Sequence, residues 1–525
     1  MQSIVTPLLA VLTANTRVPR IRVKASWLKI ADPNIVFAIV NSSLVDSSDL
    51  VAGQSEVITN SELFLYVDES QYAIRLDYDR RLDEPRAGTS HAIANVLLDN
   101  INKRFTPDQN ATIGTAIEAR RPFKMSVGFD AGGVDRTVQV IAGLTSSRPK
   151  LGRTAKTVEV EVFDYVTFID NAQLASAVYE NMRSDQIIES ILASLNFGSS
   201  QYSLDVGLNT IPFAWFDKDK SAGRRIRDLC EAEEANFYQD ENGIIRFENR
   251  NHYSTYPHQT VQRTIDAGDI LTDDDDASTP IINRAIVIAK PRKIDAAASV
   301  LWSLSSVEAI PHGETVTLWA AFYDSEAGTT SLPVKTINAP STPTDYTGNA
   351  ASDGSGSDLS ASLSIVVTNF VESAKIEVTN NHPTDTVYLT FLQLQGKAAR
   401  VTQAIQSVSE DAGSINKYEA QEYVMQNDLI QSKAVADVIS ANLKNKYKDP
   451  MGRRIIRIPG IPHLQLKDLL YVVNPDAQNL ISNPSFEVNL DDWTLSSSGN
   501  LVGSVARARD VPIFDGYFAA KITIA

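Results

Sequence analysis

Carboxylates gather at two places in the chain where a metal ion held by oxygen ligands would be sought. Asp273 to Asp276 are consecutive, and Asp353 and Asp358 flank a stretch of glycine and serine. Calcium needs oxygen ligands that converge on one point from spaced positions, which four consecutive residues cannot provide. The second stretch lacks the spacing and the distal glutamate of a helix-loop-helix calcium site. We interpret both as solvated loops.

Histidine and cysteine, the other residues that commonly hold metals or act as nucleophiles, form no recognisable pattern. The single cysteine, Cys230, lies in a helical pattern and is predicted to pack as a small apolar residue, so no disulfide can form within the chain. His252 and His258 are predicted to be surface residues. No histidine pair has the i, i+4 spacing of a zinc protease motif. The six histidines are His91, His252, His258, His312, His382 and His463.

A short string near the end of the sequence is its most readable local signature. Residues 479–487 read Asn-Leu-Ile-Ser-Asn-Pro-Ser-Phe-Glu, and Trp493 follows. This string resembles the opening strand of a carbohydrate-binding jelly-roll module. Such modules often contain a structural calcium ion, and the resemblance implies Glu487 as one oxygen ligand for it. The alternative is a jelly roll without affinity for sugar, whose aromatic residues belong to its core.

Composition limits the partners that this chain of 525 residues can bind. Its formal net charge is −16, which argues against sequence-independent binding of nucleic acid and against docking on an anionic membrane. An ordinary hydrophobic content of 43% predicts folded domains, and the length predicts three to five of them. No uninterrupted run of apolar residues is long enough for a transmembrane helix. We therefore expect no membrane anchor and no specific binding of nucleic acid.

The pattern of the first part of the chain predicts a β domain. After an N-terminal helix or arm in residues 1–19, residues 20–170 contain many short strands separated by turns, which is typical of a sandwich or barrel. Residues 158–163 have the cleanest period-two alternation. The turn at 128–133 contains glycines, but it lacks the strand–helix context of a phosphate loop. Residues 90–102 have helix-like character.

In the next segment, residues 171–263, the hydrophobic residues recur with the period of helices, and a hairpin pattern follows them. Residues 185–195 place their isoleucines on one helical face, and Ser221 is predicted to cap a second helix over residues 222–234. A hairpin follows, in which Gly243 supplies the positive φ that the turn needs. These signals predict a compact α+β unit.

Strands return in the second half of the chain. Residues 296–398 are predicted to be a β-sandwich. Within it, residues 339–360 are rich in small and polar residues and are predicted to be a long exposed loop or a flexible hairpin. The segments on either side, 264–295 and 399–475, are predicted to form one β domain into which the sandwich is inserted. An amphipathic helix is expected at 432–446, with Val435, Val438, Ile439 and Leu443 on one face.

The order of these units resembles the baseplate hub or tail-tip proteins of tailed bacteriophages. Several strings carry the resemblance: Phe105-Thr-Pro-Asp, Ile113-Gly-Thr-Ala-Ile, Arg121-Pro-Phe-Lys-Met-Ser-Val-Gly-Phe, Ile141-Ala-Gly-Leu, residues 158–165, residues 224–247, residues 388–396 and Ile461-Pro-His-Leu-Gln-Leu-Lys-Asp-Leu. The resemblance, which depends on the order of these strings, covers about residues 15–475. The inserted sandwich departs from the minimal hub, so the resemblance does not say what the sandwich does.

The resemblance implies a fold class and a set of partners. The fold would be multidomain and mainly β with α+β, and would contain hub-like β-barrel domains, a helix-hairpin unit, an inserted β-sandwich and, in residues 476–525, the start of a truncated jelly roll. The chain would be a homotrimer at the distal end of the tail in the virion. Its partners would be the tail tube and distal tail proteins, the tape measure protein, tail fibres and a host-surface glycan. The family supplies no catalytic or cofactor-binding residue.

Two other functions remain open at this point. A glycan-active hydrolase with a carbohydrate-binding module would need two carboxylates that face each other across a cleft, and no such pair is evident. A bacterial surface adhesin built from β domains would normally carry an export signal, and residues 1–12 lack the basic segment of one. We expect a structural protein and no enzyme.

Overall fold

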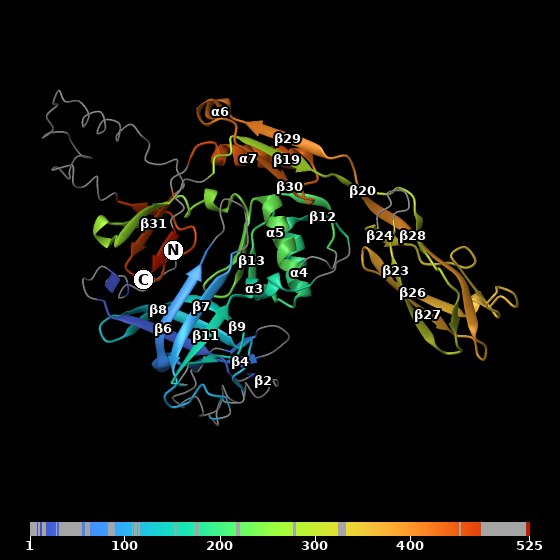
Figure 1. The fold of residues 1–525 in the computed structure, drawn as a ribbon, viewed down its shortest axis with the longest axis horizontal. Helices are drawn as coiled ribbons and strands as arrows, with labels where there is room; N and C mark the ends of the chain where they lie inside the picture. Colours follow the sequence, from blue (N-terminus) through green and yellow to red (C-terminus); the bar gives the residue numbers. More distant parts are fainter. Residues whose placement is uncertain are drawn as a thin grey trace.

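The computed structural model describes residues 8, 11–12, 17–27, 29–30, 55–57, 63–81, 90–107, 109, 113, 116–152, 154, 156–173, 178–216, 221–276, 280–323, 332–450, 453–473 and 521–524. Within them the fold is mainly β, with several β-rich units and one helical unit, which confirms the predicted fold class (Figure 1). None of the described helices has both the length and the apolar character needed to span a membrane.

The first unit is a curled antiparallel sheet. Its described strands are joined in the order β5-β1-β8-β9-β11-β7-β6, and β10 pairs with β11. Only Glu69 and the short helix η2, Ser70–Tyr72, separate β5 from β6, so the two ends of this sheet lie close together and the unit is barrel-like. The strands are β1 Pro19–Ala25, β5 Val67–Asp68, β6 Ala73–Arg80, β7 Ala92–Asp99, β8 Pro122–Asp130, β9 Asp135–Thr145, β10 Lys150–Leu151 and β11 Thr157–Phe163. A smaller sheet contains β2 Lys29–Ile30, β3 Ser55–Val57 and β4 Leu63–Leu65.

Strand β7 contradicts the helix-like character expected for residues 90–102. Its residues alternate between buried and partly exposed, because every second side chain of a strand faces the barrel core. Strand β11 has the same alternation. The inward residues of these two neighbouring strands are Ala92, Ala94, Val96, Leu98, Val158, Val160 and Val162.

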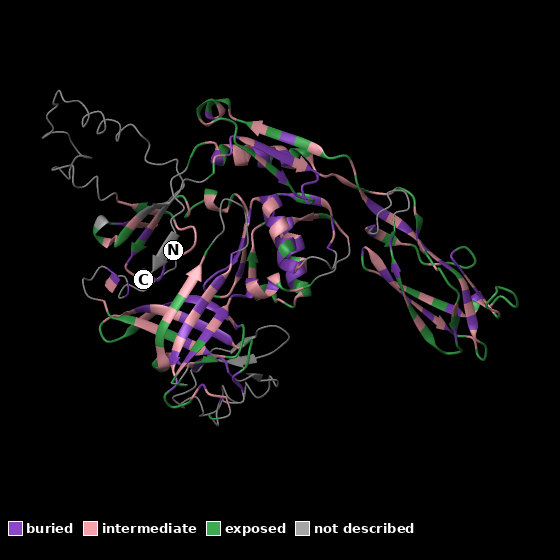
Figure 2. Cartoon of the chain, viewed as in Figure 1, coloured by how far each residue is buried: buried purple, intermediate pink, exposed green. Residues whose placement is uncertain are grey.

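The second unit contains most of the helices and follows the sequence closely. Ser221 caps α5 by accepting a hydrogen bond from the backbone N–H of Arg224, and Ile226 and Leu229 are buried, as predicted. The predicted hairpin joins β15 and β16, with Gly243 at φ +89°. Buried residues follow one face of both long helices (Figure 2). The elements are α3 Tyr165–Asp170, β12 Tyr179–Arg183, α4 Ser184–Ser194, β13 Tyr202–Leu204, β14 Thr210–Ala214, α5 Ala222–Glu233, β15 Asn236–Gln239 and β16 Ile245–Glu248.

A third unit is assembled from segments on both sides of the sandwich. In its main sheet β19 lies between β29 and β30, and α7 packs against this sheet. Helix α7 begins after the cap Ser432 and buries Ile439, but Val438 is exposed and was wrongly placed on the inner face. The elements are β17 Arg263–Ile265, β18 Thr272–Asp276, β19 Arg284–Ala289, β29 Ile405–Glu410, α6 Ala412–Tyr418, β30 Glu422–Gln426, α7 Lys433–Tyr447, β31 Arg453–Ile458 and β32 Leu470–Val472.

The inserted sandwich extends away from the other units (Figure 1). One sheet is organised around the long strand β28, Val387–Val401, which pairs with β20 Arg292–Ile294, β21 Ser299–Ser303, β22 Glu308–Ile310, β24 Val334–Ile337 and β25 Tyr346–Asn349. The other sheet has the order β23-β27-β26, with β23 Thr315–Ala321, β27 Ser373–Asn380 and β26 Leu363–Asn369. A separate apolar core lies between the two sheets.

Two segments contain strands, one of them expected to be a long loop or a flexible hairpin and the other a solvated loop. Within 339–360, β25 pairs with β28 and buries Tyr346, so this segment is partly inside the sandwich. The acidic run Asp273 to Asp276 lies in β18, which pairs with β31 so that Asp276 is opposite Arg453 in the backbone register. The acidic run therefore lies in a sheet because it pairs with β31, a basic strand far along the chain. The sequence around the acidic run does not indicate this pairing.

The segment with the carbohydrate-binding resemblance is almost wholly outside the described residues. Both Glu487 and Trp493 lie there, so the proposed calcium ligand and the jelly roll stay predictions. The described piece of this segment is β33, Lys521–Ile524, which pairs in parallel with β31.

Candidate functional site

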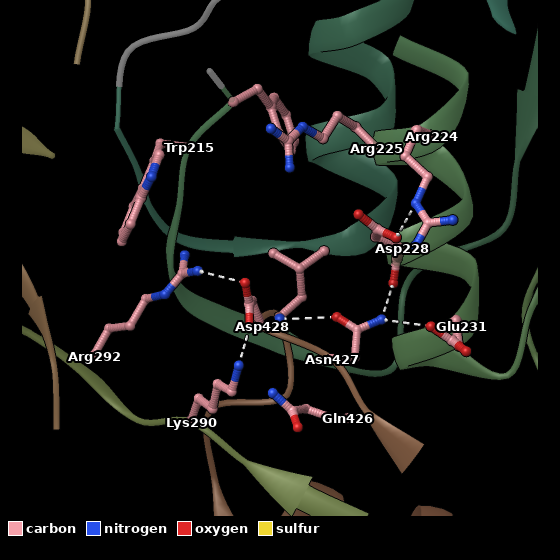
Figure 3. Close-up of a pocket in the computed structure, with 12 residues that line it drawn as sticks. Trp215, Arg224, Arg225, Asp228, Glu231, Lys290, Arg292, Gln426, Asn427 and Asp428 are labelled. Carbon is pink, nitrogen blue, oxygen red and sulfur yellow. Dashed lines mark hydrogen bonds and ion pairs between the residues drawn. The ribbon is translucent and has the colours of Figure 1, made fainter. Parts of the chain in front are cut away.

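A cavity of about 320 Å³ lies where α5 meets the third unit. It is lined by side chains from the segment after β14, from α5, from the start of β20 and the residue after β19, and from the end of β30 and the loop that follows (Figure 3). Four of these side chains are cationic and three are acidic. The charged lining residues are Arg224, Arg225, Lys290, Arg292, Asp228, Glu231 and Asp428.

Arg292 is a cation of this lining whose side chain is largely buried. Its guanidinium lies 3.8 Å from the centre of the Trp215 ring, and Nη1 donates a 3.2 Å hydrogen bond to the carbonyl of Phe213. Burial lowers the pKa of Arg292 to about 10, and the neighbouring Arg225 contributes to the lowering, while Asp428 opposes it. That pKa is still well above neutrality, so Arg292 remains a cation that the indole face and a carbonyl stabilise.

The acids of the lining are engaged with neighbouring side chains. Lys290 Nζ donates to Asp428 at 2.8 Å, and Arg224 pairs with Asp228 at 3.1 Å. The Asn427 amide donates to Glu231 at 3.1 Å, and also to the backbone carbonyl of Asp228 at 2.7 Å. The two bonds of Asn427 join α5 to the loop after β30, and we interpret the cavity as a domain junction.

The barrel and the helical unit are joined by a separate cluster at the other side of α5. Asp170, at the end of α3, accepts from Nε2 of His91 at 3.1 Å and from Nη1 of Arg227 at 2.7 Å. Gln239 of β15 accepts a 2.7 Å hydrogen bond from the backbone of Tyr165 and donates a 2.6 Å bond to the carbonyl of Ala142 in β9. Because these bonds come from buried or half-buried groups, they hold the two units in one orientation.

Raising the pH from about 6 to about 8 is expected to weaken this contact. The hydrogen bond to Asp170 raises the pKa of His91 despite the opposing effect of burial. A group whose pKa is higher in the folded state than in the unfolded state stabilises the folded state. This contribution is complete at pH values below the pKa of the unfolded state and is lost as the pH rises through the pKa of the folded state. Chemical denaturation across this range should show the decrease, and His91→Gln should reduce it. A pH dependence equal in the variant and the parent would contradict the assignment.

At low pH the same cluster is expected to weaken for a second reason. Burial alone would raise the pKa of Asp170, but hydrogen bonds from His91 and Arg227 outweigh it and lower this pKa. A lowered carboxyl pKa gives stability that is present above the unfolded pKa and is lost as the pH falls through the folded one. The contact should therefore be strongest in the mildly acidic range.

The structure brings together a polar cluster that the sequence did not predict. His252 Nδ1 lies 2.8 Å from Asp205, and its ring centre lies 4.7 Å from that of His258. Tyr238 donates a 2.6 Å hydrogen bond to Glu248, and the phenol of Tyr253 donates to the same carboxylate. His252 and His258 were predicted only as surface residues. They come together because a short helix, η5 His252–Ser254, folds this loop back over β16.

Protonation states in this cluster favour a structural role. Burial, followed by the neighbouring phenol and carboxylate, raises the pKa of Tyr253, and burial with Glu248 raises that of Tyr238. Both phenols therefore stay protonated and act as hydrogen-bond donors. Burial and the neighbouring His252 lower the pKa of His258, which favours its neutral form. A neutral histidine next to donating phenols tightens the loop without creating a nucleophile.

The remaining candidate residues show no reactive arrangement. Cys230 is fully buried, and burial raises its thiol pKa, so it packs as an apolar residue, as predicted. Asp353 and Asp358 accept hydrogen bonds from Ser355 and Ser360, two residues further along the chain. Among the described residues, no three histidine, cysteine, aspartate or glutamate side chains are grouped to hold a metal ion.

Comparisons with known proteins give weak structural likenesses. No family model matches the chain, and no curated protein matches it. Among solved structures, a 43 kDa tail protein of prophage MuSo2 from Shewanella oneidensis has a TM-score of 0.38 at 8% identity, covering 77% of this chain and 89% of that one. A tail protein from Neisseria meningitidis has a TM-score of 0.29 at 9% identity, covering 62% and 93%. The c3393 protein of E. coli, a type VI secretion component, has a TM-score of 0.24 at 9% identity, covering 66% and 76%.

Proposed function

We propose that this chain is a structural baseplate hub or tail-tip protein of a tailed bacteriophage, located in the virion at the distal end of the tail. The observation that carries the proposal is the order of units along the chain. A barrel-like sheet is followed by a helix-hairpin unit bonded to it, and then by a β unit split around an insertion. This is the order that the resemblance of residues 15–475 implies. The TM-scores above are too low to add weight to it.

The function proposed is assembly without catalysis. The described carboxylates near the cavity are engaged in ion pairs and amide hydrogen bonds, which suits a junction that transmits force between units. The bonds through Asp170 and Gln239 hold barrel and helical unit together. A tail component must keep its shape while neighbouring proteins pull on it, and such contacts provide that rigidity.

Three copies would form a ring through heterologous contacts around a central channel. Strand β6 lies at one end of the described barrel sheet and pairs only with β7 there, which leaves its other edge without a ladder partner. An unpaired edge can add a strand or a partner surface from another subunit. The ring would contact the tail tube and distal tail proteins, the tape measure protein and tail fibres.

The acidic balance of the chain fits passage of DNA through such a ring. A net charge of −16 repels phosphate and would keep DNA from adhering during ejection. This part of the proposal requires acidic groups on the channel wall. A basic channel in the assembled ring would remove it without affecting the proposed location of the protein.

Purified protein is expected to assemble into threefold rings. Mass photometry over a range of concentrations should show a species of three times the 57.5 kDa chain mass, and averaged electron micrographs should show threefold symmetry. A chain that stays monomeric at every concentration and hydrolyses a cell-wall or capsular glycan would instead support the hydrolase alternative.

A further inference from the structure

The outer face of one sandwich sheet, formed by β23, β27 and β26, has exposed aromatic and hydroxyl side chains. In the sheet β23-β27-β26, alternate side chains of each strand cover the sandwich core, including Leu318, Ile376 and Val367. The intervening side chains point away from that core. The central strand β27 has only partly exposed positions on this outer face, while its two neighbours have exposed ones. We call this outer face the platform, and its central strand is less exposed than the strands on either side.

Two aromatic rings and Val366, which is 55% exposed, form the apolar part of this platform. Trp319 of β23 is 63% exposed, and Phe370, which follows β26, is 38% exposed. Their ring centres lie 5.9 Å apart with an interplanar angle of 29°, so the rings are stacked across the central strand. The indole N–H of Trp319 donates no hydrogen bond to any residue that the structure describes. A large, rigid, exposed ring with an unused donor is suited to ligand contact.

The outward positions of the three strands are rich in hydroxyl groups and have no net charge, while Glu372 lies in the turn that contains Phe370. Lys375 and Glu377 are the only charged residues at the outward positions of the three strands, and they bond to each other at 2.7 Å. The hydroxyls of Thr315 and Thr379 lie 2.8 Å apart, which aligns them across two strands. The outward hydroxyl residues are Thr315, Thr317, Ser364, Thr368, Ser373 and Thr379.

We propose that this platform binds a neutral glycan. A pyranose ring has an apolar face of C–H groups, which fits the face of an indole, and a rim of hydroxyls, which fits threonine, serine and the Lys375–Glu377 pair. The charge of the surface selects among glycans. A platform whose two charges are mutually compensated, on a chain of net charge −16, provides no attraction for an acidic polysaccharide.

The position of the sandwich fits a polymeric ligand. The sandwich extends away from the barrel and the helical unit, so its far end is free of contact with them (Figure 1). The proposal rests on the sandwich alone and goes beyond the tail function, because sugar binding can be measured whether or not the protein forms a ring. A second copy of this chain is the competing occupant of the same platform.

Affinity electrophoresis of the full chain tests the proposal. Gels would contain one of three neutral polysaccharides, namely a β-glucan, an α-glucan or a galactomannan, with hyaluronan as the acidic comparison. At least one neutral polymer is expected to retard the protein, and hyaluronan is not. Trp319→Ala should weaken binding at least about tenfold, the effect of truncating a central aromatic anchor. Phe370→Ala should weaken it less, and Trp319→Tyr should restore part of it.

Val300→Ala is the matched control, because Val300 is similarly exposed on the other sheet of the same sandwich. It should bind like the parent. Circular dichroism of each variant would establish that the sandwich is folded, which is expected since the substituted side chains are exposed. Three results would overturn the proposal: no retardation by any of the neutral polymers, equal retardation of the parent and the folded Trp319→Ala variant, or loss of self-association in that variant with glycan binding unchanged.

Discussion

Gly223→Ala is expected to destabilise the helical unit by about 3 kcal/mol, at the upper end of the cost of overpacking. Gly223 lies in the first turn of α5, where that helix touches the end of α3. An added Cβ would lie 1.6 Å from Oδ1 of Asp170 and 2.6 Å from its Cα. Because the second contact is with backbone, a side-chain rotation cannot relieve it. The two helices must separate, and the bonds of Asp170 to His91 and Arg227 would weaken with them.

Hydrogen exchange measured by mass spectrometry can locate this effect in a protein of several units. Faster exchange is expected in α3, α5 and the barrel strands next to them, with the sandwich unchanged. Gly268→Ala is the control, since a Cβ there meets no atom within 4 Å. Equal exchange in the Gly223→Ala variant and the parent would show that α3 and α5 do not touch as described.

Removal of the Glu69 carboxylate is expected to have a similar or larger effect on the barrel. Glu69 is completely buried and accepts hydrogen bonds from Trp27 Nε1 at 2.8 Å and from Arg104 Nε and Nη2 at 2.8 and 2.9 Å. Glu69→Ala would leave the Arg104 cation largely buried without its counterion. Breaking a buried pair in this way costs about 3–5 kcal/mol.

A double variant separates the ion pair from the packing around it. Glu69→Leu with Arg104→Met removes both charges, and the barrel should regain much of the stability that Glu69→Ala loses. Asp77→Ala is the matched control, because its partner Arg75 and Asp77 itself are both exposed in the same barrel, and the expected cost is below about 1 kcal/mol. Urea denaturation followed by exchange of the barrel peptides gives the comparison. A cost for Glu69→Ala no greater than that for Asp77→Ala would contradict the buried pairing.

The sequence predicted correctly those elements whose helix caps, turn glycines and apolar periodicity lie within the element itself. Helices α4 and α5 and the hairpin between β15 and β16 each have a periodic apolar face, a capping serine or a turn glycine within a few residues. Strand β7 was wrongly predicted to be helix-like, because a short apolar segment fits both the two-residue period of a strand and the 3.6-residue period of a helix. Strand β18 was missed because its partner β31 lies far along the chain.

The polar clusters depend on long-range neighbours and could not be read from the sequence. His252 is 47 residues from Asp205, and Glu69 is 35 residues from Arg104. Arg292 and Trp215 come from different units, and no motif links them. The exposure of Trp319 was also hidden, because alternation in β23 marks two faces without indicating which of them is covered by the second sheet.

Immunogold electron microscopy of virions that contain this chain is the most direct test of its proposed place in a tail tip. Antibodies against the exposed sandwich would be used on intact particles, with the same antibodies pre-adsorbed to the purified protein as the control. The label is expected at the end of the tail farthest from the capsid. Label on the capsid, or tailed particles that carry none of this protein, would contradict the assignment.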